Sequence, residues 1–192
     1  EADPAEGTLV CPTQGAKINN RIGRKIVVKK LRIRGQITAT VQSDQADVAL
    51  PRSYRVIVYQ DTQTNGAQAQ GEDVMNAPGT ATTALAFCSF QSLANLGRFR
   101  VIKDKTYSDR NALAINDAAA TGSVVTGGAI PFKINLKFGK GVTIHFNSSN
   151  GGVGDGDVGD IVDNSFHVLI QASNTSSTGK YNYQCRAVYT DE

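Results

Sequence analysis

Hydrophobic and polar residues alternate along much of this chain, and the alternation predicts β-strands. From residue 132 to residue 138 every even position is apolar and every odd position is polar, which is typical of a strand with one buried and one solvated face. The Gly-Lys-Gly sequence at 139–141 then provides a tight turn, and the alternation resumes over residues 142–146. These two runs are therefore predicted to form a β-hairpin.

The same period of two recurs in further segments, each bounded by Gly, Pro, Asn or Asp. These segments are residues 25–39, 53–61, 99–107, 165–173 and 180–190. An eighth strand is predicted around Val74 or residues 84–87, and residues 89–96 are predicted to form a single short helix. Short antiparallel strands joined by long, irregular loops favour an all-β fold, a single eight-stranded antiparallel jelly-roll sandwich.

The length of 192 residues suits one domain with a substantial core. We expect a jelly-roll domain over residues 21–192 and an N-terminal extension over residues 1–20. No apolar run approaches the roughly 18 residues of a spanning helix, so no membrane insertion is expected. Residues 1–7 are acidic and polar, and no secretory signal is expected from them.

Few residues are suited to catalysis. The chain has two histidines, His145 and His167, and both fall in predicted strands on the face opposite the apolar positions. No Gly-x-Ser-x-Gly nucleophile motif is present, so the sequence does not predict an enzyme. The cysteines Cys11, Cys88 and Cys185 are odd in number and fit neither a disulfide framework nor a zinc site. Free thiols in a reducing compartment are the simplest interpretation.

Carboxylates recur at short spacing in the glycine-rich loop over residues 147–163, a composition that can collect oxygen ligands for Ca²⁺. The loop lacks the bidentate Glu and the flanking helices of a calcium-binding loop, and a solvated, turn-rich loop is the interpretation we prefer. We therefore predict no cofactor and no metal site. If a structural divalent cation binds, its candidate ligands are Asp155, Asp157 and Asp160.

Positive charge is concentrated near the N-terminus, where eighteen consecutive residues contain eight Lys or Arg and no acidic residue. If Leu31 and Ile33 face the core, alternation places Lys30, Arg32 and Arg34 in a row on the outer face. Such a row is tolerated best beside a polyanion and predicts salt-dependent phosphate contacts. The alternative is an edge strand that charge protects from aggregation. The candidate nucleic-acid-binding residues are Arg24, Lys25, Lys29, Lys30, Arg32 and Arg34.

Three blocks carry recognisable strand and turn signatures. They are RKIVVKKLRIRG at 24–35, YRVIVYQDTQTNG at 54–66 followed by DVM at 73–75, and LGRFRVIKDK at 96–105. With these blocks the chain resembles the capsid proteins of small circular single-stranded DNA viruses, the circovirus-like members of the Rep-encoding CRESS-DNA virus group. The resemblance covers most of the chain from Ile22 onward.

The resemblance implies a viral capsid (coat) protein of the virion. Such a protein self-assembles into a small icosahedral shell, as a homo-oligomer around a circular single-stranded DNA genome, and meets a host-cell receptor that the sequence does not identify. The basic residues named above would lie on or near the inner surface. The loops at 62–96, 108–129 and 147–163 would form outer surface or subunit contacts. The family's basic N-terminal arm would also imply the host nucleus during assembly, but residues 1–10 are acidic, so nuclear entry is expected only if such an arm is present.

A second function, from a different class, stays open. A secreted trimeric jelly-roll binding module for a receptor or glycan would use the same architecture. The sequons at Asn147 and Asn174 fit secretion, whereas the unpaired cysteines and the basic strand argue against it.

Overall fold

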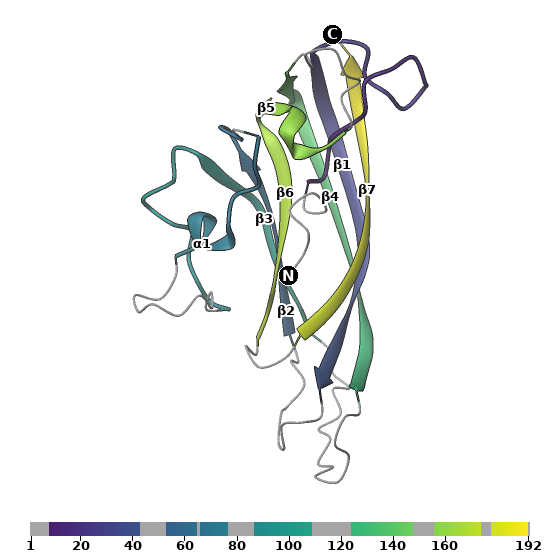
Figure 1. Cartoon of the computed structure of the whole chain (residues 1–192). Coiled ribbons are helices and arrows are strands. Elements are labelled where there is room, and N and C mark those ends of the chain that lie inside the picture. Colours follow the sequence, from purple (N-terminus) through teal and green to yellow (C-terminus); the bar gives the residue numbers. More distant parts are fainter. Residues whose placement is uncertain are drawn as a thin grey trace.

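The computed structural model describes residues 8–42, 53–64, 66–76, 87–108, 124–147, 156–173 and 178–191. Within these ranges seven strands form two antiparallel sheets, which face each other as two layers (Figure 1). The first sheet has the order β5-β4-β1-β7, with β5 at Ile161–Asp163, β4 at Val124–Phe146, β1 at Lys25–Gln42 and β7 at Thr178–Asp191. The second has the order β3-β2-β6, with β3 at Phe99–Ser108, β2 at Ser53–Asp61 and β6 at Ser165–Ala172. The all-β prediction is confirmed.

The described residues contain seven strands, one fewer than the eight predicted. Val74 belongs to the short helix α1 at Gly71–Val74 and not to a strand. The other predicted location is residues 84–87; residues 84–86 lie outside the described residues, and Phe87 belongs to a turn. No helix in the described part of the chain is long and apolar enough to cross a membrane.

The helix predicted at 89–96 is wrong, because this segment forms turns. Backbone groups of this segment form hydrogen bonds with residues 74–76 of the same chain. The Ser92 N–H donates to the Val74 carbonyl at 2.9 Å, and the Asn76 N–H donates to the Phe90 carbonyl at 2.7 Å. These bonds remove the partners that an α-helical ladder would need.

The hairpin predicted at 132–146 is also wrong, because β4 continues through the glycines as one long strand beside β1. The register passes from Val28 opposite Val142 to Lys30 opposite Lys137, so residues 138–141 bulge out opposite Lys29. The bulge is possible because Gly141 adopts a φ of 84°, in the region that favours glycine. β4 also begins earlier than predicted, since residues 124–129 are strand and not loop. Residues 109–123 of the same predicted loop lie outside the described residues.

The main core fills the space between the two sheets and follows the predicted alternation. Leu31 and Ile33 of β1 and Ile134 of β4 face side chains such as Val56 and Phe166 from the other sheet, and all five are at most 2% exposed. Aromatic stacking joins the layers, since the Phe138 and Phe166 ring centroids lie 5.2 Å apart. Leu9 and Val10 belong to this core as well, so the described part of the predicted N-terminal extension packs on the domain.

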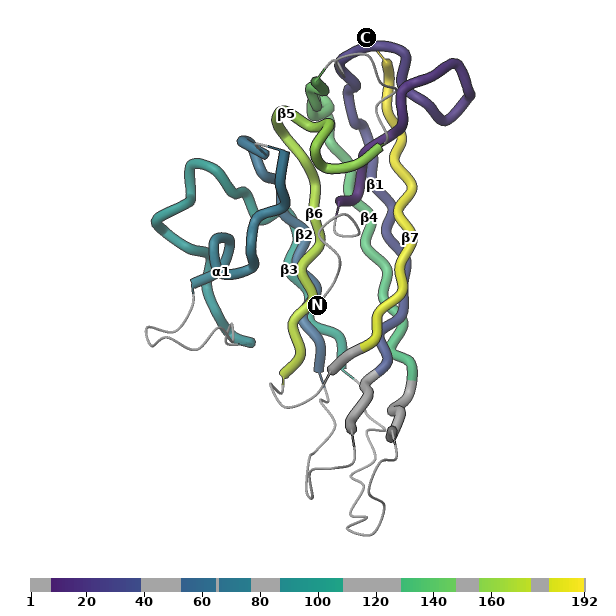
Figure 2. Tube along the Cα trace, viewed as in Figure 1, coloured from purple at the N-terminus to yellow at the C-terminus, as the bar shows by residue number. Residues whose placement is uncertain are grey.

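The central strand β2 of the second sheet is buried on both faces, whereas much of the edge strand β3 is exposed. On its outer face a smaller core contains Ile57, Tyr59, Val74, Met75 and Phe99. Figure 2 shows that α1 and the chain around it cover this face, on the side away from the first sheet. The outer face of the first sheet has no comparable cover among the described residues, and its side chains are mostly exposed.

Candidate nucleic-acid interface

The outer face of β1 is built as the alternation predicts. Leu31 and Ile33 are fully buried, whereas Arg32 and Arg34 are exposed and Lys30 is half-buried. The strand thus presents three cations on one side and aliphatic core residues on the other.

Pairing with β4 and β7 extends this row into a surface. Lys137, Asn135 and Lys133 of β4 stand opposite Lys30, Arg32 and Arg34, and Val188, Arg186 and Gln184 of β7 stand opposite the same three residues on the other side. Directly paired residues of antiparallel strands point to the same face. Further along, Lys180 pairs with Thr38. We name this surface the cationic face; its charged members are Lys30, Arg32, Arg34, Lys133, Lys137, Lys180 and Arg186.

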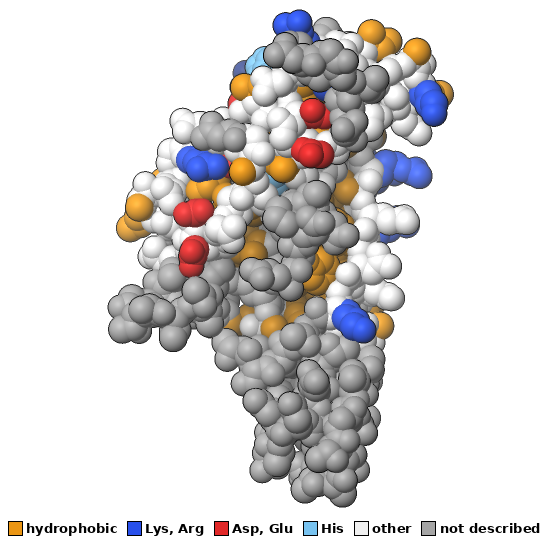
Figure 3. All heavy atoms as spheres, viewed as in Figure 1, with side chains coloured by type: hydrophobic (Ala, Val, Ile, Leu, Met, Phe, Trp, Pro, Cys, Tyr) orange, Lys and Arg blue, Asp and Glu red, His pale blue; other side chains and the backbone are white. Residues whose placement is uncertain are grey.

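No acidic residue occupies the described outward positions of β1, β4 and β7 around these seven cations. The mutual repulsion is visible at Lys30, where the charge of Arg32, then desolvation, then the charge of Lys137 lower the pKa of the ammonium group. Figure 3 shows several of the Lys and Arg side chains projecting along the margin where β7 lies in Figure 1. A bound polyanion would relieve this repulsion, because it supplies the opposite charge that the face lacks.

The geometry suits phosphate groups better than bases. A hollow in the face is lined by Arg32, Arg34, Gln184 and Arg186, and guanidinium groups can bind phosphate oxygens bidentately. The tyrosines of β7 point to the core side, so the described outward positions hold no aromatic ring on which a base could stack. The face can therefore hold a nucleic-acid backbone, but it offers little sequence readout.

The structure brings together only half of the predicted set. Arg24 and Lys25 lie exposed at the start of β1, before the bulge, and Lys25 pairs with His145. Lys29 lies at the bulge, where its ammonium group donates to the Lys140 carbonyl at 3.2 Å. Sequence reasoning missed the cations of β4 and β7, although both strands were predicted. The missing information was which strands are neighbours of β1, and a single-strand pattern does not contain it.

The two histidines have different surroundings. His145 is half-exposed, and its Nδ1 lies 2.9 Å from both carboxylate oxygens of Asp163. His167 is fully buried and stacks on Tyr59, with ring centroids 5.3 Å apart. It does lie opposite the main core, as predicted, but the second core covers that face too. Burial lowers the pKa of the His167 imidazole to about 4.

Ser165 and His167 form a close pair within this buried region. The Ser165 Oγ lies 2.6 Å from the His167 Nε2 and accepts a hydrogen bond from the Thr64 hydroxyl at 2.7 Å. All three residues are inaccessible to solvent, and no described group bonds to the His167 Nδ1. A catalytic pair needs access for a substrate and a partner that orients the base, so the arrangement fits a structural link between β6 and the chain that follows β2.

Two of the three candidate metal ligands already hold the loop together. The Asp157 carboxylate accepts from the Gly159 N–H, and the Asp160 carboxylate accepts from the Gly156 N–H at 3.0 Å. Asp155 lies outside the described residues. In the described ranges no group of three His, Cys, Asp or Glu side chains is placed to share a metal ion.

The three cysteines are unpaired, as the sequence predicts. Burial raises the pKa of Cys11 to about 12 and the pKa of Cys185 to about 11. Because the thiolate is the reactive form, both thiols are poor nucleophiles at neutral pH. Cys88 is exposed.

Comparison with known proteins found no family model and no curated protein that match this chain. The class of this protein is defined by its fold and its site. It is an all-β protein of two antiparallel sheets, one of which presents a cationic outer face.

Proposed function

We propose that this protein is the capsid subunit of a small circular single-stranded DNA virus, which self-assembles into an icosahedral shell and contacts the packaged genome through phosphates. The observation that carries the proposal is the cationic face, seven Lys and Arg side chains on one side of a sheet without an acidic neighbour in the described outward positions. In the assembled virion this face would line the lumen, where the genome supplies the counter-charge.

Strand pairing supports a jelly roll as the finer fold. A jelly roll wraps a long antiparallel ribbon, so that its first strand pairs with its last and its second with the one before the last. Here β1 pairs with β7 and β2 pairs with β6. The pairing of β4 with β1, and not with β7, departs from the simplest form of that wrapping.

The proposal assigns no catalytic role to the chain and no cofactor. The Ser165 and His167 pair is sealed from solvent, and the described carboxylates of the glycine-rich loop are engaged by backbone N–H groups. Both observations favour a structural protein over an enzyme.

The test is to express the chain, to examine it by electron microscopy and to record the 260/280 nm absorbance ratio of the assembled fraction. We expect closed particles that carry nucleic acid. The double change Arg32→Glu with Arg34→Glu should lower the ratio, because it reverses two charges at the centre of the cationic face. The matched control is Arg100→Glu with Lys103→Glu, which makes the same charge change at two exposed positions of β3 in the other sheet.

A ratio that falls equally in both double variants would assign the effect to net charge and not to the cationic face. If the wild-type chain forms only monomers or trimers, the shell is contradicted and the receptor- or glycan-binding module becomes the better proposal.

A further inference from the structure

Two apolar surfaces project from opposite sides of the molecule, and neither contains a residue of the cationic face. The first is the loop at residues 13–23, which we name the N-terminal loop. Ile18 at its tip is 98% exposed and Ile22 is 75% exposed. Both values are unusual for isoleucine, which is among the residue types most often buried.

The N-terminal loop is held in place despite its exposed tip. Arg21 N–H donates to the Thr13 carbonyl and Gly15 N–H donates to the Arg21 carbonyl, which closes the loop at its base. The Arg21 side chain is 1% exposed, and its guanidinium carbon lies 4.2 Å from the centroid of the Phe146 ring. The loop therefore begins and ends at a fixed base on the main core.

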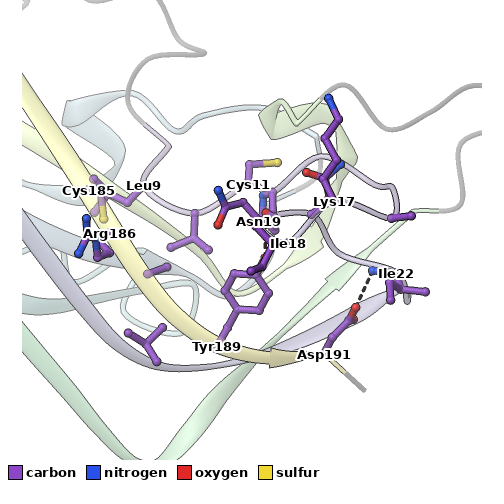
Figure 4. A pocket seen from close by; sticks show the side chains of 16 residues that line it. Leu9, Cys11, Lys17, Ile18, Asn19, Ile22, Cys185, Arg186, Tyr189 and Asp191 are labelled. Atoms are coloured by element: carbon purple, nitrogen blue, oxygen red, sulfur yellow. Dashed lines mark hydrogen bonds between the residues drawn. The ribbon is translucent and has the colours of Figure 1, made fainter.

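The end of β7 holds the other side of the loop. The Ile22 N–H donates to the Asp191 carboxylate at 2.5 Å, and the Tyr189 hydroxyl donates to the Asn19 carbonyl at 3.1 Å. Figure 4 shows Tyr189 and Asp191 reaching from β7 towards the loop residues. A loop that is already ordered loses little further entropy when it binds a partner.

The second surface is formed by residues 87–98, called the 87–98 segment below. Phe90 is 83% exposed, Leu93 is 75% exposed and Leu96 is 51% exposed. Three large apolar side chains within seven residues form a patch of the kind that marks a protein contact.

Arginines fasten this segment at both ends. At its start, Arg55 of β2 donates to the carbonyls of Phe87 and Ser89 at 2.9 and 2.8 Å, while Asp104 binds the same guanidinium. At its end, Arg98 forms a two-bond ion pair with the fully buried Asp61. These two guanidinium charges are thus balanced within the subunit.

The charges beside the two surfaces are opposite. Lys17 and Arg24 are exposed on or next to the N-terminal loop, and residues 8–24 contain no acidic residue. The Asp191 carboxylate of β7 also lies at the loop, where it accepts hydrogen bonds from the Ile22 and Gly23 N–H groups. Glu72 and Asp73 of α1 lie next to the 87–98 segment, because the Asn95 amide donates to the Asp73 carbonyl at 2.9 Å. Figures 1 and 2 place the loop and α1 on opposite sides of the molecule, so one subunit cannot bring them together.

We propose that the N-terminal loop of one subunit packs against the 87–98 segment of a second copy, with Lys17 near Glu72 across the contact. This inference rests on the proposed self-assembly and names the surfaces that would carry it. Two different surfaces on opposite sides make the contact heterologous, and a heterologous contact closes into a ring when the rotation allows. An isologous contact of either surface with itself would place like charges together.

Cross-linking between two variants tests which surfaces meet. One variant carries Ile18→Cys with Cys88→Ser, and the other is the wild-type chain, whose exposed Cys88 lies at the start of the 87–98 segment. After co-assembly and treatment with a short bismaleimide, mass spectrometry should find position 18 of one subunit joined to Cys88 of the other. Links of position 18 to itself, or of Cys88 to itself, would contradict the heterologous contact.

A second test exchanges the charges of Lys17 and Glu72 and leaves the exposed apolar side chains of both surfaces unchanged. We expect Lys17→Glu to lower the amount of assembled particles roughly tenfold, and Glu72→Lys to do the same. The double variant should recover assembly, because it restores an opposite pair. The control for Lys17→Glu is Lys105→Glu, which makes the same charge change at an exposed position of β3 outside both surfaces and should leave assembly unchanged.

The outcomes separate the two proposals. Normal particles from both single charge variants, with no link between position 18 and Cys88, would overturn this contact and leave the shell standing. Failure of the wild-type chain to assemble would overturn both.

Discussion

The His167 imidazole is fully buried between the second sheet and its outer cover, where it stacks on Tyr59. A protonated imidazole in that position would be a buried charge beside Arg98, with Asp61 already engaged by the same arginine. His167 is therefore neutral in the folded protein down to acid pH. The protonation of this one side chain is thus coupled to the stability of the fold.

We predict that the free energy of unfolding falls as the pH drops from about 6.5 to about 4. The pKa of His167 is about 4 in the folded protein, against an ordinary value of 6.5 that applies to the unfolded chain. In this window the unfolded chain binds a proton that the folded chain does not. The loss is complete below the folded pKa and amounts to roughly 3 kcal/mol. Urea unfolding at pH 7, 5 and 4 measures it.

The comparison that isolates this effect is His167→Gln against His145→Gln. The first should flatten the pH dependence at some cost in stability at neutral pH, and the second leaves the buried imidazole unchanged. A wild-type stability that is constant from pH 6.5 to pH 4 would show that His167 is not kept neutral by the fold.

At the scale of the element, β4 shows how a local pattern misleads. The sequence at 139–141 carries the signature of a tight turn, yet β1 is long enough to pair with the residues on both sides of it. Continued pairing satisfies the backbone groups of both halves of β4 beside one partner strand, and the extra residues are accommodated as a bulge.

We predict that Gly141→Ala destabilises the protein by about 1 to 3 kcal/mol, since a non-glycine residue at a φ of 84° is strained. Its Cβ would also meet the Val27 side chain. Gly139→Ala is the matched control two residues away, because no atom lies within 4 Å of a Cβ built there. Thermal unfolding of the two variants compares them directly, and equal melting temperatures would contradict the bulge.

For the whole molecule, the separation of surfaces is the main consequence of the fold. The first sheet turns its positive charges to one side, and the second sheet carries a second core on its outer face. The apolar N-terminal loop and the 87–98 segment project at opposite margins. This separation is what the proposed shell requires, with the charged face towards a polyanion and the two apolar surfaces available for the proposed contacts between subunits.

Nucleic-acid binding should be strongly salt-dependent and nearly independent of sequence. We predict that Arg186→Ala weakens binding of single-stranded oligonucleotides by a similar factor for every sequence and reduces the slope of log affinity against log salt by about one. Fluorescence anisotropy at several salt concentrations measures both quantities. A change confined to one oligonucleotide sequence would indicate base contacts and would contradict this prediction.

Several features of this protein followed from sequence alone. The alternation placed Leu31 and Ile33 in the core and Arg32 and Arg34 on the surface, because the geometry of a strand turns successive side chains to opposite faces. The same reasoning identified the all-β class and the unpaired cysteines, since each depends on local pattern or composition.

Other features depended on which segments meet in space. Only the pairing of β1 with β4 and β7 brought Lys133, Lys137, Lys180 and Arg186 beside the predicted cations. Only packing of the 87–98 segment on α1 replaced the predicted helix with turns. Strand partners and tertiary backbone bonds join residues far apart in the chain, so no local period encodes them, and the tertiary structure decided where the charges of this protein gather.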